Sequence, residues 1–343
     1  MTRRRLIGLL LVMTLILAAC GGASGGGGGD CAPGAIRIPR GAGGVGFLPL
    51  LVMEKKKELL EKHAEEAGVP DLEVCWLDVG GPSMMNQKLL AGAVDFIAAG
   101  PPAFLILWDQ TLNGEKVKGV AAMTSLPMYL NVRGDKLKKL EDFKDGDQIA
   151  MTATQSSIPA IVIQMYAAEK YGPKESGRFD KFTVQMPHPN GVNALLSGKL
   201  AAHFTSPPFH QREQKNADIH TIMTTDDVMK GSTTFTMLST TTEFRNRNPK
   251  AVAAVLATLE EVTKLINNDR KAAADMLMSS EKESGLTPEE LMEVIGDSSV
   301  KFTTTPENVM KYAEFMYSTK TLKNLPGSLK DLFFDEIDGV PKN

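Results

Sequence analysis

The sequence is poor in the residues that most often carry chemistry. Its 343 residues include three cysteines, two tryptophans and five histidines, and the histidines lack a metal-ligand spacing such as HExxH. There is no GxSxG nucleophile motif and no Walker phosphate-binding sequence. Thirty-eight lysines and arginines against 41 acidic residues exclude the basic excess that nucleic-acid binding needs. We therefore expect no enzyme, no cofactor, no metal and no nucleic-acid partner.

One long apolar run is present, at the N-terminus. Arg3, Arg4 and Arg5 precede an apolar stretch from Leu6 to Leu17, which is too short to span a membrane comfortably and has the layout of a signal peptide. The remaining length suits about two domains, and 43% hydrophobic with 23% charged residues is ordinary for a globular protein.

The apolar run ends in Leu17-Ala18-Ala19-Cys20. This resembles the lipobox of bacterial lipoproteins, and the resemblance implies a signal peptide over residues 1–20 and lipidation of Cys20. An ordinary signal with a chance cysteine is the alternative. Residues 21–33 are rich in glycine and have the composition of a tether. The export route, general secretory or twin-arginine, stays open.

Two further cysteines, Cys31 and Cys75, would lie in an oxidising compartment after export. They form a disulfide if their strands are neighbours, or remain two separate thiols with Cys75 buried. The sequence leaves both alternatives open, because bridging depends on the distance between the Cα atoms.

Short apolar strands followed by small or polar turns and then by helices recur along the chain, which predicts an α/β fold with a parallel sheet. The expected strands are residues 35–39, 72–79, 94–99, 117–123, 128–132, 149–151, 182–186, 201–205 and 233–240. The expected helices are residues 47–67, 83–91, 103–110, 159–171, 192–197, 249–267, one opened by the capping box Thr287–Glu290, and 305–317. In such sheets ligands bind outside the carboxyl ends of the strands.

The first three of these ends are small, which leaves room for a ligand. They contribute the candidate contacts Arg40, Gly43, Gly44, Gly81, Pro82, Gly100, Pro101 and Pro102. Gly41, Gly43 and Gly46 match a dinucleotide-binding GxGxxG in form. We reject that interpretation, because Asp78, at the end of the second strand, is too far along the chain to be the ribose-binding acid.

Five polar residues lie between the strand 149–151 and the helix from Pro159: Thr152, Thr154, Gln155, Ser156 and Ser157. Serine and threonine are usual N-caps, and ordinary capping is one interpretation. The other is an anion site, since a helix N-terminus offers free N–H groups and a positive dipole end. By this second interpretation Gln155, Ser156 and Ser157 hold the anionic group of a ligand.

For other aromatic and histidine residues near the expected loops, the sequence allows either a ligand contact or a structural role. His203 and His210 flank a Phe204–Phe209 segment and either touch a ligand or are satisfied elsewhere. Phe47, Phe209 and Phe235 indicate a larger organic ligand or belong to the core.

In order and spacing, the chain is similar to the solute-binding proteins of ABC importers for sulfonates, nitrate and taurine. The matching elements are Arg40-Gly41, Trp76–Pro82, Ala91–Phe96, Gly100–Pro102, Ile149-Ala150 with Gln155–Ser157, Ala194–Gly198 with Ala202–Thr205, and Thr233–Leu238. The resemblance implies a type II periplasmic-binding-protein fold with the ligand between two lobes. One lobe would be residues 34–127 plus 230–343 and the other residues 128–229. It also implies ligand contacts at His188, Thr205, Ser206 and Thr234, besides those named above.

The resemblance further implies a lipid-anchored, monomeric protein of the cell envelope, in the periplasm or on the outer face of the cytoplasmic membrane. It would capture a small organic anion, a sulfonate or carboxylate, and deliver it to a membrane permease. Residues 205–209 replace the tryptophan–aspartate–proline segment usual in this family, so the ligand can differ from an alkanesulfonate. Alternatives are a thiamine pyrimidine precursor, for which Asp78 and Asp95 are the nearby acids, and an enzyme of the same fold.

Overall fold

In the computed structural model, residues 31–41, 43–280 and 285–335 are described. The expected signal peptide, Cys20 and residues 21–30 of the expected tether lie outside them. Within these ranges, none of the helices combines the length and the apolar composition that crossing a membrane requires.

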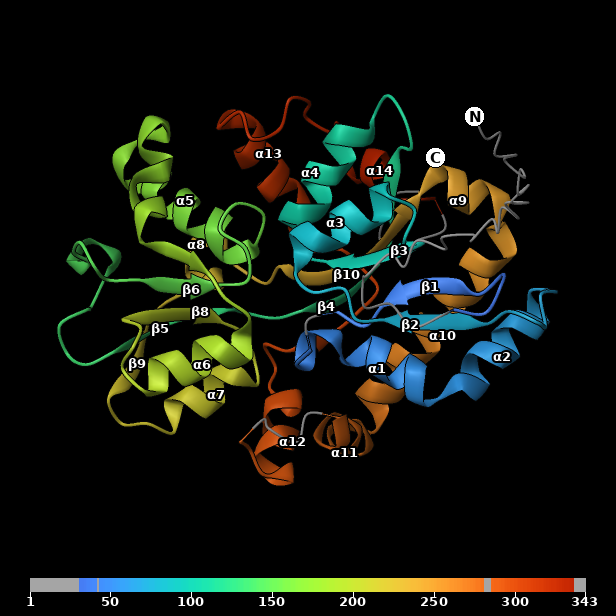
Figure 1. Cartoon of the computed structure of the whole chain (residues 1–343), viewed down its shortest axis with the longest axis horizontal. Coiled ribbons are helices and arrows are strands. Elements are labelled where there is room, and N and C mark those ends of the chain that lie inside the picture. The colour runs from blue at the N-terminus through green and yellow to red at the C-terminus, as the bar shows by residue number, and fades with distance from the viewer. Residues whose placement is uncertain (1–30, 42, 281–284, 336–343) are drawn as a thin grey trace, which may run out of the picture. The chain divides into compact units, whose positions relative to one another are not determined.

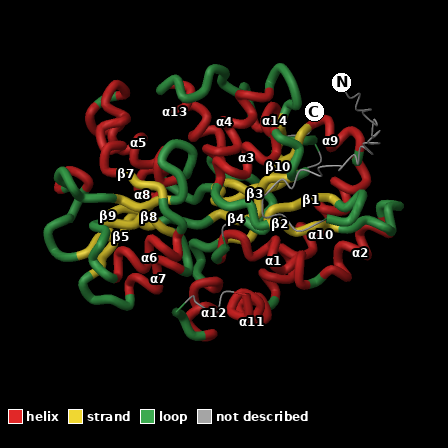
Figure 2. The backbone as a smooth tube through the Cα atoms, in the orientation of Figure 1, coloured by secondary structure: helices red, strands yellow, loops and turns green. Residues whose placement is uncertain are grey.

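The strands form three sheets, and the two-stranded and four-stranded sheets lie side by side (Figures 1 and 2). In the first, β1 (Ile36–Pro39) pairs in parallel with β2 (Val74–Leu77). The second has four strands in the order β11 (Lys301–Phe302), β4 (Val117–Ser125), β10 (Thr234–Thr241) and β3 (Phe96–Ala99). In it β10 runs antiparallel to both of its neighbours.

The third sheet has five strands in the order β7 (Thr183–Gln185), β6 (Ile149–Met151), β8 (Ala202–Thr205), β5 (Tyr129–Arg133) and β9 (Ile219–Thr224). β6 is parallel to β7 and β8, whereas β5 is antiparallel to β8 and β9. The chain enters this sheet from β4 through residues 126–128 and leaves it for β10 through residues 230–233.

The expected parallel layout is found in the pairs β1–β2, β6–β7 and β6–β8. It is wrong for the four-stranded sheet, in which every pair is antiparallel, and for both pairs that β5 makes. β5 and β10 are the strands by which the chain enters a new sheet, and only three residues join β4 to β5.

Helices cover both faces of the sheets (Figure 1). Above the four-stranded sheet lie α3 (Pro82–Leu90), α4 (Pro101–Thr111), α13 (Val309–Ser318) and α14 (Leu329–Leu332), and below it lie α1 (Leu48–Lys55), α2 (Lys57–Glu66), α10 (Pro249–Asn268) and α11 (Arg270–Ser280). The five-stranded sheet has α5 (Ile158–Tyr171) and α8 (Thr225–Met229) on one face and α6 (His188–Leu196) and α7 (Phe209–Gln214) on the other. The remaining helices are α9 (Thr242–Arg247), α12 (Pro288–Gly296) and the 3₁₀ segments Val45–Phe47, Leu140–Asp142 and Pro173–Phe182.

Several helix boundaries differ from those expected. The helix expected over residues 47–67 is broken at Lys56, whose backbone is not helical. The last long helix begins at Val309 rather than at Thr305, because the backbone of Glu307 is bound to Thr234. The Glu307 N–H donates to the Thr234 hydroxyl at 2.8 Å, and the Thr234 N–H donates to the Glu307 carbonyl at 3.0 Å. The capping box at Thr287 and Glu290 is confirmed, with both reciprocal hydrogen bonds present.

The disulfide that the sequence left open is formed. Cys31 and Cys75 have their Cα atoms 5.6 Å apart and are 44 residues apart in the chain. The geometry arises because β2, which contains Cys75, is the direct neighbour of β1, which begins five residues after Cys31. The first residue of the described fold is therefore fastened to the second strand.

Candidate functional site

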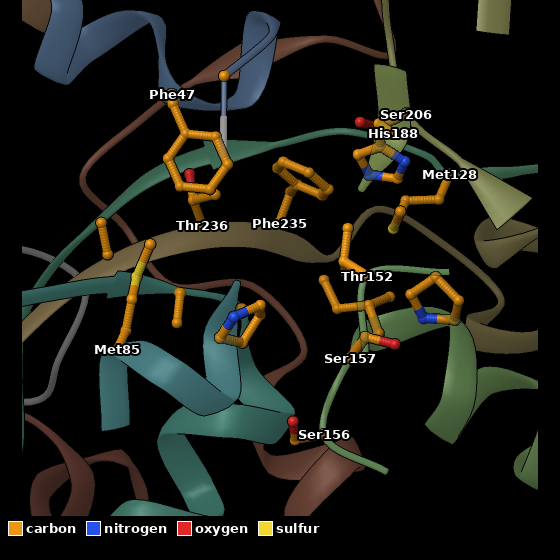
Figure 3. Close-up of a pocket in the computed structure, with 17 residues that line it drawn as sticks. Phe47, Met85, Met128, Thr152, Ser156, Ser157, His188, Ser206, Phe235 and Thr236 are labelled. Atoms are coloured by element: carbon orange, nitrogen blue, oxygen red, sulfur yellow. The ribbon is translucent and has the colours of Figure 1, made fainter. Parts of the chain in front are cut away.

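A pocket lies where β3 and β10 of the four-stranded sheet meet turns and helix starts that adjoin the five-stranded sheet (Figure 3). It holds about 530 Å³ not filled by protein atoms, which includes space open to solvent. Its wall consists of Gly43, Phe47, Pro82, Met85, Ala98, Ala99, Gly100, Met128, Thr152, Ser156, Ser157, Ile158, Pro159, His188, Ser206, Phe235 and Thr236. None of these lining residues is a lysine, arginine, aspartate or glutamate.

The apolar part of the wall is built around two aromatic rings. Phe47 and Phe235 meet edge to face, with ring centroids 6.2 Å apart, and in Figure 3 Phe235 lies between Phe47 and His188. A Cβ atom at Gly46 would lie 2.0 Å from the Phe235 ring, so glycine at this position makes room for the aromatic pair. Met85 and Met128 complete this surface, and methionine adapts well to irregular ligand shapes.

The start of α5 is on the wall, but its cap is already satisfied. The Ser157 hydroxyl accepts the Ala160 N–H at 3.4 Å and donates its own hydrogen to the Ala153 carbonyl at 2.5 Å. Pro159 has no N–H to offer. Ser157 is therefore a capping residue in the wall, and its hydroxyl hydrogen is not available to a ligand.

Ser156 differs from its neighbours on both sides. Its hydroxyl lies 2.9 Å from the hydroxyl of Ser83 on α3, and its side chain is buried, whereas Gln155 is exposed and is not part of the wall. Each serine hydroxyl has one hydrogen to donate and two lone pairs. One of the two serines can donate to the other while the second hydrogen remains for a ligand.

His188 is the titratable group in the wall, and it is 5% exposed. Its Nδ1 lies 3.0 Å from His203 Nε2 and 3.3 Å from the Thr205 hydroxyl. Its ring packs on Phe209 at a centroid distance of 5.2 Å. Burial, and then the charge of the neighbouring His203, lower the pKa of His188 well below its ordinary value, so that His188 is neutral.

The structure brings together seven of the fifteen residues that the sequence suggested as ligand contacts. They are Gly43, Pro82, Gly100, Ser156, Ser157, His188 and Ser206. The other eight lie outside the wall: Arg40, Gly44, Gly81, Pro101, Pro102, Gln155, Thr205 and Thr234.

Some of these eight have other partners. The Arg40 guanidinium binds Glu54 at 2.8 Å and Asp78 at 3.3 Å, and Thr234 binds the backbone of Glu307 at 2.8 Å. A Cβ at Gly44 would lie 3.1 Å from the Pro207 carbonyl oxygen. Glycine at this position permits close approach between the chain after β1 and the chain after β8 rather than contact with a ligand.

Sequence reasoning missed Met85, Ala98, Ala99, Met128, Ile158, Pro159 and Thr236 as wall residues, and it left Thr152, Phe47 and Phe235 undecided. Side-chain alternation along β10 could not have located Thr236, because the pairing register shifts between Thr234 and Thr236 and the adjacent Phe235 and Thr236 both line the pocket. The methionines carry no sequence signal either, because a gap-filling core methionine has the same sequence context.

The α/β architecture with two lobes is the periplasmic-binding-protein fold. A model of the NMT1-like family matches residues 45–279, and the chain belongs to this family. A search among curated protein sequences gave no match.

Solved structures share the fold at low sequence identity. The alkanesulfonate-binding protein SsuA of Xanthomonas axonopodis pv. citri, bound to MOPS, has a TM-score of 0.64 and 16% identity over 86% of this chain and 96% of its own. The periplasmic aliphatic sulphonate-binding protein SsuA of Escherichia coli has a TM-score of 0.60 and 16% identity over 91% and 94%. The periplasmic nitrate-binding protein NrtA of Synechocystis PCC 6803 has a TM-score of 0.62 and 15% identity over 87% and 84%.

Proposed function

We propose that this protein is the solute-binding component of an ABC importer, and that it captures a small organic anion of sulfonate or carboxylate type outside the cytoplasm for delivery to a membrane permease. The observation that carries the proposal is the composition of the pocket wall. His188 and Ser206 lie together at one end of the wall, with Phe235 between them and Phe47 (Figure 3), and Thr152 and Ser156 add further hydroxyl groups. Such a wall suits a ligand with one polar end and an apolar body.

The polar end recognises an anion through neutral donors. Hydroxyl and imidazole N–H groups donate hydrogen bonds to anionic oxygens, and hydrogen bonds to a charged group are roughly twice as strong as neutral ones. A wall without a lysine or arginine avoids the desolvation cost of a buried cation while the site is empty. The names of two similar structures, which bind alkanesulfonates and aliphatic sulphonates, support the same ligand class.

We propose residues 34–127 plus 230–343 as one lobe and residues 128–229 as the other, with hinge closure on the ligand. Supporting this division, the chain passes between the sheets at residues 126–128 and 230–233. The helix α10 contacts α1, α2 and β4, so this part of the C-terminal region packs on the first lobe.

We also propose that Cys20 carries the lipid anchor, which would place a monomeric protein in the periplasm or on the outer face of the cytoplasmic membrane. The support is the sequence Leu17–Cys20 after an apolar run.

A cationic thiamine precursor fits this pocket less well. Its recognition would call for an acid in the wall, and the two candidates have other partners: Asp78 with Arg40 at 3.3 Å and Asp95 with Arg37 at 2.6 Å. We propose a binding protein rather than an enzyme, and the binding proteins among the similar structures support this.

Thermal unfolding with a panel of ligands tests the function, because a ligand that binds the folded state raises the melting temperature. We expect MOPS, longer alkanesulfonates and aromatic carboxylates to raise it more than nitrate, which has no apolar body. Ser206→Ala should lower the affinity of the best ligand roughly tenfold, whereas Ser197→Ala should not, because Ser197 is an exposed serine at the opposite end of α6 from His188. If no anion in the panel raises the melting temperature, the proposal is wrong.

A further inference from the structure

Two buried side chains lie behind His188, outside the pocket wall. His203 Nε2 is 3.0 Å from His188 Nδ1, and His203 Nδ1 is 2.5 Å from Glu213 Oε1. His203 and Glu213 are both 0% exposed. A continuous series of hydrogen-bonding groups therefore leads from α7 through β8 to the pocket.

Glu213 has a hydrogen-bonding partner at each carboxyl oxygen. Oε1 lies 2.5 Å from His203 Nδ1, and Oε2 accepts a hydrogen bond from Asn131 Nδ2 at 2.7 Å. The amide orientation of Asn131 is set by Thr221, whose hydroxyl donates to Asn131 Oδ1 at 2.7 Å. A carboxylate can accept at both oxygens, and a buried carboxylate requires a compensating charge, for which His203 is the partner within reach.

This geometry fits an imidazolium at His203, which would have a hydrogen on each ring nitrogen. Its Nδ1–H would donate to Glu213, and its Nε2–H would donate to His188 Nδ1. Since Nδ1 of the neutral His188 accepts, its single hydrogen must be on Nε2. Both hydrogen bonds that the described residues give His188 use Nδ1, so Nε2–H is left for the pocket.

We propose that His203 and Glu213 are positioning residues that hold His188 as an N–H donor toward the pocket, and that they thereby select a ligand whose anionic oxygen accepts this hydrogen bond. This inference rests on the proposed function and names how the site distinguishes ligands. With a neutral His203, the shared hydrogen would move to His188 Nδ1, and Nε2 would become an acceptor. The same pocket would then favour a ligand with a donor group.

The packing around the pair is shaped to allow this contact. A Cβ at Gly191 of α6 would lie 2.6 Å from His203 Nε2, so glycine lets the helix that begins with His188 lie directly on the His203 ring. The other titratable group nearby is His210, whose Nδ1 is 3.1 Å from Asn131 Nδ2. Burial lowers the pKa of His210 to about 4, so His210 is not the group that compensates Glu213.

Nuclear magnetic resonance tests the arrangement without a ligand. Two-bond ¹H–¹⁵N correlation spectra of the protein labelled with ¹⁵N-histidine show which ring nitrogen carries hydrogen, and loss of signals in His188→Gln assigns His188. We expect the Nε2–H form in the wild type and the Nδ1–H form in Glu213→Gln. The exposed Glu65→Gln on α2 is the matched control and should leave the spectrum unchanged.

A wild-type His188 with its hydrogen on Nδ1 would overturn the inference, as would a Glu213→Gln spectrum identical to that of the wild type. If Glu213→Gln does not fold, Gly191→Ala is the second variant. It displaces His203, and we expect averaged rather than fixed His188 shifts. A merely structural role for Glu213 would lower the melting temperature and leave the Nε2–H form in place.

The binding consequence is measured by calorimetric titration with MOPS. Glu213→Gln should weaken MOPS binding roughly tenfold to a hundredfold, as expected for a lost hydrogen bond to a charged group, and Glu213→Asp should restore part of it. Equal affinity in wild type and Glu213→Gln would overturn the selection of anions. Failure of every sulfonate and carboxylate to bind the wild type would refute the proposed function, and the spectra would still decide whether the pair positions His188.

Discussion

The hydroxyl oxygens of Ser83 and Ser156 lie 2.9 Å apart and join α3, which covers the four-stranded sheet, to the turn before α5, which covers the five-stranded sheet. Ser156 is in the pocket wall and Ser83 is not. A hydrogen bond between two lobes at the edge of the site favours the arrangement in which they are close together.

Removal of this hydrogen bond should weaken ligand binding even when the wall is untouched. We expect Ser83→Ala to reduce MOPS affinity by a few-fold to tenfold, corresponding to about 0.5–1.5 kcal/mol. The double variant with Ser156→Ala should then cost less than the sum of the two single changes, because both remove one shared bond. Calorimetric titration of the four proteins measures this, and strictly additive costs would show that the two serines act separately.

Ser157 provides a contrast between capping and ligand binding. Ser157→Ala removes the acceptor for the Ala160 N–H and should lower the free energy of unfolding by about 1 kcal/mol, with little effect on MOPS affinity. Ser157→Asp retains a cap acceptor but places a negative charge in the wall, and should weaken MOPS binding at least tenfold. Urea unfolding and titration of both variants check this. A Ser157→Ala variant that loses affinity but not stability would reverse our assignment.

Stability should fall in mild acid because of two buried histidines. The pKa of His188 is lowered well below 6.5, and that of His210 is lowered to about 4, both by burial. Below pH 6.5 the unfolded chain therefore binds more protons at these positions than the native state, and the free energy of unfolding decreases as the pH falls. The slope approaches about 1.4 kcal/mol per pH unit for each histidine.

Urea unfolding between pH 7.5 and 5 measures this slope, a range in which most carboxylates remain charged. His210→Gln should flatten it, whereas His63→Gln, in α2 and outside the pocket wall, is the matched control. A slope that is the same in His210→Gln and in the wild type would show that His210 does not titrate as described.

Lipidation at Cys20 is tested in bacterial cells. We expect the wild type to stay with the membrane fraction and to carry acyl mass on Cys20, and Cys20→Ala to be released or left unprocessed. The expectation rests on Leu17–Cys20 and the preceding apolar run. Fractionation with mass spectrometry decides it, and equal membrane retention of both proteins without acyl mass would contradict it.

The positions of strands and turns could be predicted from the sequence because they depend on local signals. Ile149–Met151 is a short apolar run, and the Thr287–Glu290 capping box is a four-residue pattern; both are found where expected. The turns after β1, β3, β6 and β8 contribute Gly43, Gly100, Thr152 and Ser206 to the pocket wall. They do so because the carboxyl ends of strands gather at one edge of a sheet.

The chemistry inside the pocket could not be predicted in the same way, because it depends on partners distant in sequence. Arg40 suggested an anion contact, yet Glu54 and Asp78 neutralise it. Ser157 and Gln155 have side chains as polar as that of Ser156, but one is used by its own helix and the other is exposed. Nothing in the sequence around Glu213 indicates that it faces His203 in the core.

The Cys31–Cys75 disulfide determines how force would pass from an anchor into the fold. With Cys20 lipidated as proposed, only the residues between Cys20 and Cys31 would connect the lipid to the fold. Fully extended, this segment reaches about 40 Å. A force applied through this segment would be transmitted by the disulfide to Cys75 and shared by β1 and β2. β1 would therefore not separate from its sheet alone. If the anchor and the proposed permease are correct, the protein would meet that permease only within about this distance of the membrane, and its first two strands would share any tension.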